Sequence, residues 1–284
     1  MANIAFLGTG LLGSAFAEAA AKRGDTVSAW NRSPDKLQAL ASFGIKAAAT
    51  PAEAVRGATR VHLILKDDAV IEEVIAAARP GLATDAVLID HSTTLPKLTA
   101  ARAARLQAEG LCYLHCPVFM GPAAARQAQG SMLAAGPEAL FERVAGDLAK
   151  MTGRLEYLGE RPDLAAVHKL LGNTMLIGSW AVIADVLTVA RAGGVAGEDA
   201  IKLLGLLDMN NVVSLRGGNM AKGNFTPSFE LAMARKDVGL MLETTGDLPL
   251  ATLRAIAARM DQLIAAGHGA DDASVLGIEA LNGR

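Results

Sequence analysis

Short apolar runs alternate with segments of helical periodicity over residues 1–160. Strands are predicted at residues 3–7, 26–30, 60–65, 86–90, 111–116, 130–135 and 155–158. Repeated strand–helix units of this kind indicate an α/β fold, a Rossmann domain built on a doubly wound parallel sheet. Ligands of such sheets bind beyond the carboxyl ends of the strands, so the loops that begin at Lys66 and His91 are expected to face a ligand.

The longest apolar segment covers residues 163–194, with no charged side chain from Leu170 to Ala184. A helix that is apolar on every side is buried in protein or in lipid. The uncharged run is shorter than the ~18–20 residues that a bilayer requires, and Asn173 interrupts it. We therefore expect a helix packed between two parts of one soluble protein, with Asp163 as its N-cap.

Beyond Gly194 the strand alternation stops and only helical patterns remain. Helices are predicted at residues 198–208, 212–221, 229–245 and 248–266, with a short one from residue 274. The chain should therefore have two domains. Residues 1–162 form the predicted Rossmann domain, and residues 163–284 form a predicted all-α domain, joined through the long interdomain helix.

Charge and cysteine usage narrow the function classes. The 284 residues carry a net charge of −2, so no basic footprint indicates nucleic acid or a membrane surface. Cys112 and Cys116 form neither a metal-ligand set nor a disulfide framework, which favours a cytoplasmic location and no bound metal. The N-terminal stretch lacks the basic region of a signal peptide, and no membrane anchor is expected.

A glycine-rich motif, Gly8-Thr9-Gly10-Leu11-Leu12-Gly13, separates the first strand from a helix predicted at residues 14–23. In a strand–turn–helix setting this spacing is typical of dinucleotide binding, because pyrophosphate binds free N–H groups at a helix N-terminus. The glycines permit a tight turn, close approach of the phosphates and close helix packing. The alternative is a tight turn that needs glycines for conformational reasons alone.

The end of the second strand carries Asn31-Arg32-Ser33 where an NAD site usually has Asp or Glu. A guanidinium binds a ribose 2′-phosphate through paired charge-assisted hydrogen bonds, and Ser33 can add another. NADP(H) is therefore the preferred cofactor, with NAD(H) as an alternative. The competing interpretation is an exposed arginine that opens a helix over residues 34–43.

Two further groups are candidates for ligand contact. Ser92 and Thr93 follow the strand at residues 86–90, where their hydroxyls could bind a ligand or cap the next helix. Lys169 and Asn173 are four residues apart and share one face of the apolar helix. An ammonium at such a place is costly unless it is used, although a solvated lysine remains the alternative.

These residues resemble the β-hydroxyacid dehydrogenase family over essentially the whole chain. The family includes 3-hydroxyisobutyrate dehydrogenases and glyoxylate/succinic semialdehyde reductases, with a 6-phosphogluconate dehydrogenase-like C-terminal domain. Lys169 falls on the catalytic lysine of the family, and Lys236-Asp237 matches the pair that closes over cofactor and substrate. The resemblance implies cofactor contacts from Gly8, Gly10, Leu11, Leu12, Gly13, Asn31, Arg32, Ser33, Ser92, Thr93 and Lys236. It implies substrate contacts from Ser92, Phe119, Met120, Gly121, Asn173 and Asp237.

The chain departs from the family pattern in the loop that follows the strand at residues 111–116. Family members usually have Pro-Val-Ser-Gly-Gly there, whereas this chain has Pro117-Val118-Phe119-Met120-Gly121. Bulky apolar groups thus replace the serine and glycine that contact the substrate carboxylate in the family. A tighter or more apolar pocket is expected. Gly172 also stands where another asparagine is often found.

The resemblance implies hydride transfer between a nicotinamide and a carbonyl carbon, interconverting a small β-hydroxyacid and its semialdehyde. Lys169 would donate the proton during reduction and accept it during oxidation, and Asn173 would hold the oxygen. His168 points about 100° away on the helix and is assigned to packing.

Two alternatives remain. An imine reductase shares this fold and cofactor; Lys169 argues against it, whereas the Phe119-Met120 loop favours it. A non-catalytic NADP-binding regulator would bind cofactor without turnover, and the presence of Lys169, Asn173 and Lys236 argues against it. The apolar helix predicts association through the C-terminal domain, as a homodimer or homotetramer.

Overall fold

The computed structural model describes residues 2–281, which divide into two compact units after Asn173. The division falls inside helix α8 (Leu164–Ala192). The sequence places the boundary ahead of this helix, at residues 162 and 163. The first turns of α8 belong to the first unit because Ala165 and Ala166 are fully buried there and Lys169 bonds a carbonyl of that unit.

The first unit contains a six-stranded parallel sheet in the order β3-β2-β1-β4-β5-β6, which confirms the predicted doubly wound Rossmann fold. Its strands are β1 (Asn3–Leu7), β2 (Thr26–Trp30), β3 (Lys46–Ala47), β4 (Arg60–Leu63), β5 (Val87–Asp90) and β6 (Cys112–His115). The strand order reverses between β1 and β4, and such a reversal is where these folds bind their ligands. The edge strand β3 was not predicted, since it is only two residues long.

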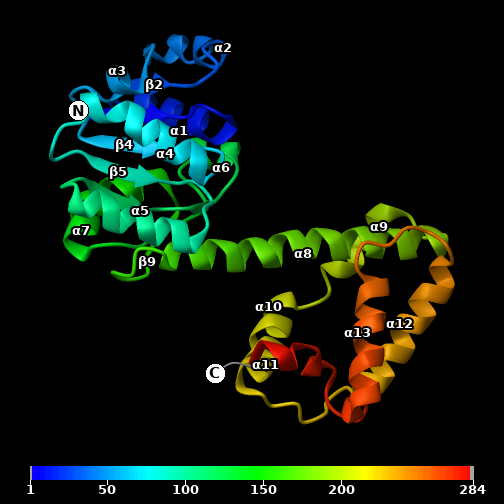
Figure 1. The fold of residues 1–284 in the computed structure, drawn as a ribbon. Helices are drawn as coiled ribbons and strands as arrows, with labels where there is room; N and C mark the ends of the chain where they lie inside the picture. Colours follow the sequence, from blue (N-terminus) through cyan, green and yellow to red (C-terminus); the bar gives the residue numbers. More distant parts are fainter. Residues whose placement is uncertain (1, 282–284) are drawn as a thin grey trace. The chain divides into compact units, whose positions relative to one another are not determined.

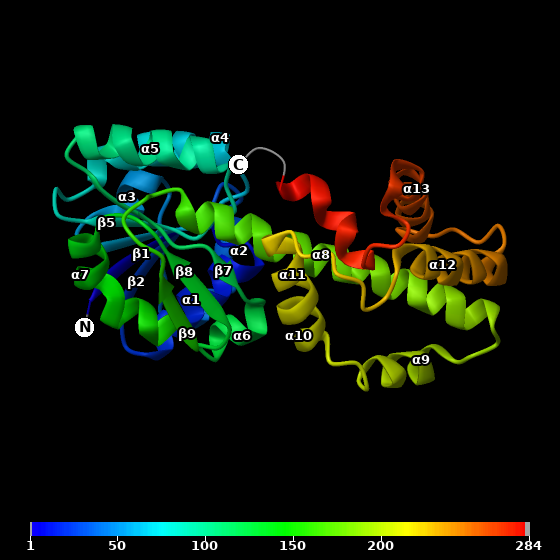
Figure 2. The ribbon, with the colours of Figure 1, turned by 90° about the horizontal axis from the view of Figure 1, so that it is seen from below.

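Helices cover both faces of this sheet (Figure 1 and Figure 2). One face carries α1 (Leu11–Lys22), α6 (Pro122–Arg126) and α7 (Glu138–Leu148), and the other carries α3 (Pro51–Val55), α4 (Asp68–Ala78) and α5 (Pro96–Ala108). The sequence of strand β1 is continuously apolar because both of its faces are covered. Ile4 and Phe6 pack into the core under α1, α6 and α7, whereas Ala5 and Leu7 pack into the core under α3, α4 and α5.

The end of the first unit forms a second, three-stranded sheet. Strand β7 (Val118–Phe119) pairs antiparallel with β8 (Ser131–Ala134), which pairs parallel with β9 (Arg154–Tyr157). The loop expected after β6 is therefore strand at two of its residues, Val118 and Phe119. Pro117 has no N–H and cannot continue the hydrogen bonding of the six-stranded sheet. Its carbonyl instead accepts from the backbone N–H of Leu133, so the chain joins the second sheet at this point. The helix predicted at residues 34–43 also breaks, into α2 (Asp35–Gln38) and a 3₁₀ turn (Ala41–Phe43).

Helix α8 is continuous over 29 residues, as predicted. The expectation that it is packed between two parts of one soluble protein stays a prediction for most of its length. Exposed apolar side chains along it include Leu171, Met175, Ile177, Trp180 and Val182. By length and composition it is also the one helix among residues 2–281 that could cross a membrane, a test that helices of soluble proteins also pass. The apolar composition of α8 therefore indicates that another surface packs against it, but it does not identify that surface.

The second unit is all-helical, as predicted. It contains α9 (Gly197–Leu204), α10 (Met209–Asn211), a π-helical stretch (Val212–Gly217), α11 (Gly218–Lys222), α12 (Leu231–Thr245), α13 (Leu253–Leu263) and a final 3₁₀ helix (Ala273–Leu281). Helices α12 and α13 share one core with that final helix. Helix α13 begins five residues later than predicted at Leu253, because the carboxylate of Asp185 accepts hydrogen bonds from the N–H groups of Thr252 and Leu253, at 2.8 and 2.9 Å.

Candidate functional site

The three motif glycines have three different surroundings. Gly8 has a φ of +101°, and a Cβ there would lie 2.2 Å from the carbonyl oxygen of Ile64. A Cβ on Gly13 would lie 2.0 Å from the carbonyl oxygen of Gly8, so both positions require glycine for packing. Gly10, the N-cap of α1, has nothing within 4 Å of its built Cβ. The open space beside Gly10 is where the backbone can approach a phosphate.

A pocket of about 660 Å³ opens beside this turn. It brings together most of the residues that the sequence assigns to the cofactor, namely Gly8, Gly10, Leu11, Leu12, Asn31, Arg32 and Ser33. Gly13 does not line it, consistent with a packing role. Lys66, three residues beyond β4, lines it as well, and Lys36 lines it without having been predicted. Its position could have indicated this role, because Lys36 is a basic residue only four positions after Arg32 and lies on the predicted helix.

The residues after β2 divide between scaffold and surface. The Asn31 side chain accepts from the N–H of Thr9 at 3.0 Å and donates to the carbonyl of Ser33 at 3.1 Å, which ties the glycine turn to the end of β2. Arg32 and Lys36 are exposed on the pocket rim. Within residues 2–281 neither of them forms an ion pair, so both charges are available to an anion.

The loop after β5 is fixed by its own hydroxyl. Ser92 is buried, its Oγ accepts from the N–H of Leu65 at 3.0 Å, and its N–H donates to Asp90 Oδ1 at 2.9 Å. Thr93 is exposed. Neither hydroxyl caps α5, whose N-cap is Leu95 without a side-chain bond. The capping interpretation is therefore wrong, and the bond to Leu65 joins this loop to the pocket wall.

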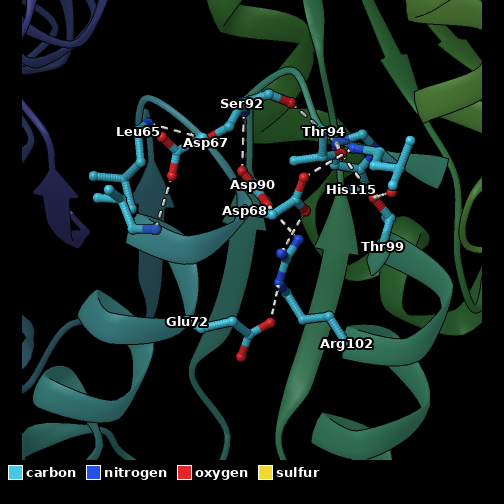
Figure 3. A network of polar contacts seen from close by, with 12 residues as sticks. Leu65, Asp67, Asp68, Glu72, Asp90, Ser92, Thr94, Thr99, Arg102 and His115 are labelled. Atoms are coloured by element: carbon cyan, nitrogen blue, oxygen red, sulfur yellow. Dashed lines mark hydrogen bonds and ion pairs between the residues drawn. The ribbon is translucent and has the colours of Figure 1, made fainter. Parts of the chain in front are cut away.

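A buried ionic network supports the Ser92 loop, and Figure 3 shows Arg102 reaching from α5 to the carboxylates of α4. The fully buried guanidinium donates to Asp68 at 2.7 Å and to Glu72 at 2.8 Å and lies 3.6 Å from Asp90. Burial alone would lower the pKa of Arg102, but Tyr113, Asp68 and Asp90 raise it above its usual value. The sequence analysis did not identify this arginine. The available signal was Asp90, an acidic residue at the end of a buried strand that needs a cationic partner.

Two buried histidines connect β4 to the loop that follows β6. His91 Nδ1 donates to the carbonyl oxygen of Cys116 at 2.7 Å, and His91 Nε2 lies 2.9 Å from His62 Nδ1. Burial lowers the pKa of His91 to about 4 and that of His62 well below its usual value. Both rings are neutral at pH 7, and through them β4 is linked to the chain after β6, a connection that the sequence did not reveal.

Lys169 is held by β7. Its Nζ donates to the carbonyl oxygen of Val118 at 2.8 Å and lies 4.1 Å from the centre of the Phe119 ring. The side chain is half-buried, and burial lowers the pKa of its ammonium. Because its Nζ is bonded to a backbone carbonyl and lies over an aromatic ring, the solvated-lysine alternative does not describe Lys169.

The other predicted substrate residues occupy different places. Asn173 lies one turn beyond Lys169 on α8 and is half-buried. Met120 packs against the core of the first unit, and Gly121 is the N-cap of α6. His168 uses Nδ1 to donate to the carbonyl of Leu164 on its own helix, as expected for a packing residue.

The predicted lysine–aspartate pair lies in the second unit, on α12. Lys236 and Asp237 form an ion pair with each other at 3.0 Å, and both side chains are exposed. Each is thus available for contacts outside its helix, and their assignment to cofactor and substrate stays a prediction.

Two sequence families match the chain. The NAD binding domain of 6-phosphogluconate dehydrogenase matches residues 3–159, and the NAD-binding domain of NADP-dependent 3-hydroxyisobutyrate dehydrogenase matches residues 164–278. The chain is 28% identical to 3-sulfolactaldehyde reductase of Escherichia coli K12, over 97% of this chain and 95% of that protein. It is also 28% identical to the cytokine-like nuclear factor N-PAC of Xenopus tropicalis, over 84% of this chain and 46% of that protein.

The fold is shared with solved structures. An imine reductase from Pseudomonas sp. aligns with a TM-score of 0.90 over 99% of both chains at 19% identity, a likeness that concerns the fold alone. The first family match covers more than half of the chain, and the second covers most of the remainder. The chain therefore belongs to the β-hydroxyacid dehydrogenase family of NAD(P)-dependent oxidoreductases.

Proposed function

We propose that the protein is an NADP(H)-dependent reductase that interconverts a small β-hydroxyacid, or a related hydroxy compound, and its semialdehyde or carbonyl form. The observation that carries this proposal is the half-buried Lys169, held by the Val118 carbonyl in the same unit as the glycine pocket. The Escherichia coli relative is named for its reduction of 3-sulfolactaldehyde, which supports a small polar aldehyde as the substrate class.

The pocket fits a dinucleotide that carries an additional phosphate. The space at Gly10 accepts a backbone-bound pyrophosphate, and the exposed cations Arg32 and Lys36 suit a 2′-phosphate. The fixed Ser92 loop would face the nicotinamide end, with Thr93 exposed beside it. Lys236 and Asp237 are proposed to contribute from the second unit.

The bound nicotinamide supplies or accepts the hydride. Lys169 donates a proton to the carbonyl oxygen as an ammonium during reduction, and as the neutral amine it accepts the proton during oxidation. Burial lowers the pKa of Lys169, which makes proton release easier than from a solvated lysine. Asn173, one turn further along α8, is proposed to hold the reacting oxygen.

The second candidate is NADPH-dependent imine reduction. The apolar Phe119 and Met120 in the loop before α6 favour it, and the solved imine reductase shares the fold. The regulator alternative gains a relative named as a nuclear factor, but Lys169 and its β7 contacts support catalysis.

We also propose that a second copy of the chain covers the exposed apolar face of α8, as part of a homodimer or homotetramer. Trp180 and Ile177 are 64% and 57% exposed on the single chain, and such an apolar face on a soluble protein marks an association surface.

One assay panel tests the function. Small semialdehydes, 2-oxo acids and a cyclic imine are compared with NADPH and NADH, alongside the reverse reaction with 3-hydroxy acids and NADP or NAD. The expected result is turnover of a semialdehyde with NADPH. Preferential turnover of the imine would establish the second candidate, and cofactor binding without any turnover would establish the regulator.

Cofactor choice has its own test. Replacement of Arg32 in Arg32→Asp places a negative charge where a 2′-phosphate is expected, so kcat/KM should fall at least about tenfold more for NADPH than for NADH, because charge-assisted bonds to the phosphate are lost. Lys66→Asp, on the same pocket, is the control and should affect both cofactors equally. Equal losses in Arg32→Asp would remove the assignment.

A further inference from the structure

An aromatic ring occupies the space between two residues of α8. Phe119 is the last residue of β7, and its ring lies 4.1 Å from Lys169 Nζ. Lys169 and Gly172 are three positions apart and share one helix face. The preceding residue, Val118, provides the carbonyl that accepts from the same Nζ. Strand β7 thus supplies both the carbonyl and the ring that contact the amine.

Gly172 is the residue that leaves room for this ring. A Cβ built on Gly172 would lie 2.2 Å from Cζ and 2.5 Å from Cε1 of Phe119, so any side chain there displaces the ring. Gly178 lies on the same helix with nothing within 4 Å of its built Cβ. The close contact is therefore particular to Gly172 and does not arise from the helix itself.

We propose that Phe119 is a positioning residue for Lys169, and that its ring can lie there only because residue 172 is a glycine. The ring and the glycine together hold the amine for proton transfer. The catalytic role of Lys169 rests on the proposed function, whereas the placement of its amine does not. An ammonium has three N–H groups. The Val118 carbonyl takes one, the face of the ring attracts a second, and the third stays free for the oxygen of a substrate.

The ring also favours the protonated amine. The negative face of an aromatic ring attracts a cation, which opposes the effect of burial. Other ionisable groups are few at this point. Residues 117–121 include none, His168 bonds the Leu164 carbonyl, and Asp163 pairs with Arg161. Within residues 2–281 Lys169 forms no ion pair, so the ring and the carbonyl are the groups that retain the proton on it.

Direct titration of Lys169 tests the placement without using turnover. Lysines labelled biosynthetically with ¹³C at Cε, which leaves the amine unmodified, are titrated by NMR in the full chain, and Lys169 is assigned by its absence in Lys169→Arg. Phe119→Leu should lower the pKa of Lys169 by about one unit, since a partly buried cation–π contact is lost. An unchanged pKa in Phe119→Leu overturns the proposal.

A mutant cycle tests the role of Gly172. Alanine in a helix interior ordinarily stabilises relative to glycine, and Gly178→Ala is the control that should do so. Gly172→Ala should instead lower both the melting temperature and the pKa of Lys169. In the Phe119→Leu background the space is free, so the same change should lower neither. Equal effects of Gly172→Ala in both backgrounds would overturn the coupling.

The pH dependence of turnover separates this inference from the proposed function. Reduction needs the ammonium form, so its rate falls as pH rises through the pKa of Lys169, and Phe119→Leu should move that fall to lower pH by about one unit while KM for NADPH changes less than about twofold. If Lys169→Ala retains full turnover, the proposed function fails, and the NMR titration and the cycle still decide the placement.

Discussion

The unit boundary divides α8 into two parts of similar apolar composition and different surroundings, residues 164–173 as its first half and residues 174–192 as its second half. In the first half Ala165 and Ala166 are fully buried in the first unit, and Lys169 is held by β7. In the second half Ile177 and Trp180 are exposed on the single chain. Hydrophobic burial is non-directional, so an apolar sequence states that a helix needs a cover without stating which surface provides it.

The charged groups of the two halves differ in how fully their hydrogen-bonding capacity is used. Asp185, in the second half, is buried and saturated: its carboxylate accepts from the backbone of residues 251–253 and from the hydroxyl of Thr252. Lys169 has one carbonyl, one ring face and a spare N–H. A charge with all its partners inside the fold stabilises structure, whereas a half-satisfied one is available for chemistry.

The largest effect should come from the first half. Lys169→Ala should reduce kcat by about 10²–10⁴, because the proton donor is lost, while NADPH binding stays nearly intact. Steady-state kinetics and a fluorescence titration with NADPH measure the two quantities. His168→Ala is the matched neighbour and should retain activity, since His168 bonds only its own helix. Full turnover in Lys169→Ala would remove the functional distinction between the two halves.

A smaller loss, in stability, is expected from the second half. Asp185→Ala leaves several buried N–H donors without an acceptor and should lower the free energy of unfolding of the second unit by about 3 kcal/mol. Faster amide exchange at residues 251–253 measures it. Asp185→Asn retains one acceptor oxygen and should lose less. Unchanged exchange in Asp185→Ala would show that these bonds do not anchor the helix.

The same carboxylate predicts a pH dependence. Burial would raise the pKa of Asp185, but bonds from Thr252, Ala251 and Leu253 lower it overall. A lowered folded-state pKa gives stability that is present above the unfolded value of about 3.9 and is lost as pH falls through the folded value. Acid unfolding of the second unit should therefore be less steep in Asp185→Ala, as measured by amide exchange between about pH 5 and pH 2.

The smallest effect, on self-association, is expected at the exposed apolar face of the second half of α8. Trp180→Glu should weaken self-association by about 2 kcal/mol or more, because a large exposed aromatic is a typical interface anchor. Sedimentation equilibrium over a range of protein concentrations measures it. Leu98→Glu, an exposed apolar position on α5 of the first unit, is the control. Equal oligomeric state for wild type and Trp180→Glu would leave the second half of α8 without its proposed cover.

Local chemistry made much of the nucleotide pocket predictable. The requirements of Gly8 and Gly13 act over a few residues and one strand contact, and Asn31, Arg32 and Ser33 follow from their place at the end of β2. Arg102 was not predictable, because its partners Asp68 and Asp90 come from separate elements that only the sheet brings together.

The sequence by itself determined the order of strands and helices, the glycine turn and the placing of Lys169 and Asn173 on one helix face, because backbone periodicity and turn chemistry act over short distances. The tertiary structure alone decided that Phe119 lies over Lys169, that Gly172 makes room for it and that Ile177 and Trp180 of α8 are exposed on the single chain. These facts depend on packing between residues distant in sequence, and side-chain shape becomes decisive only once the backbone has brought them together.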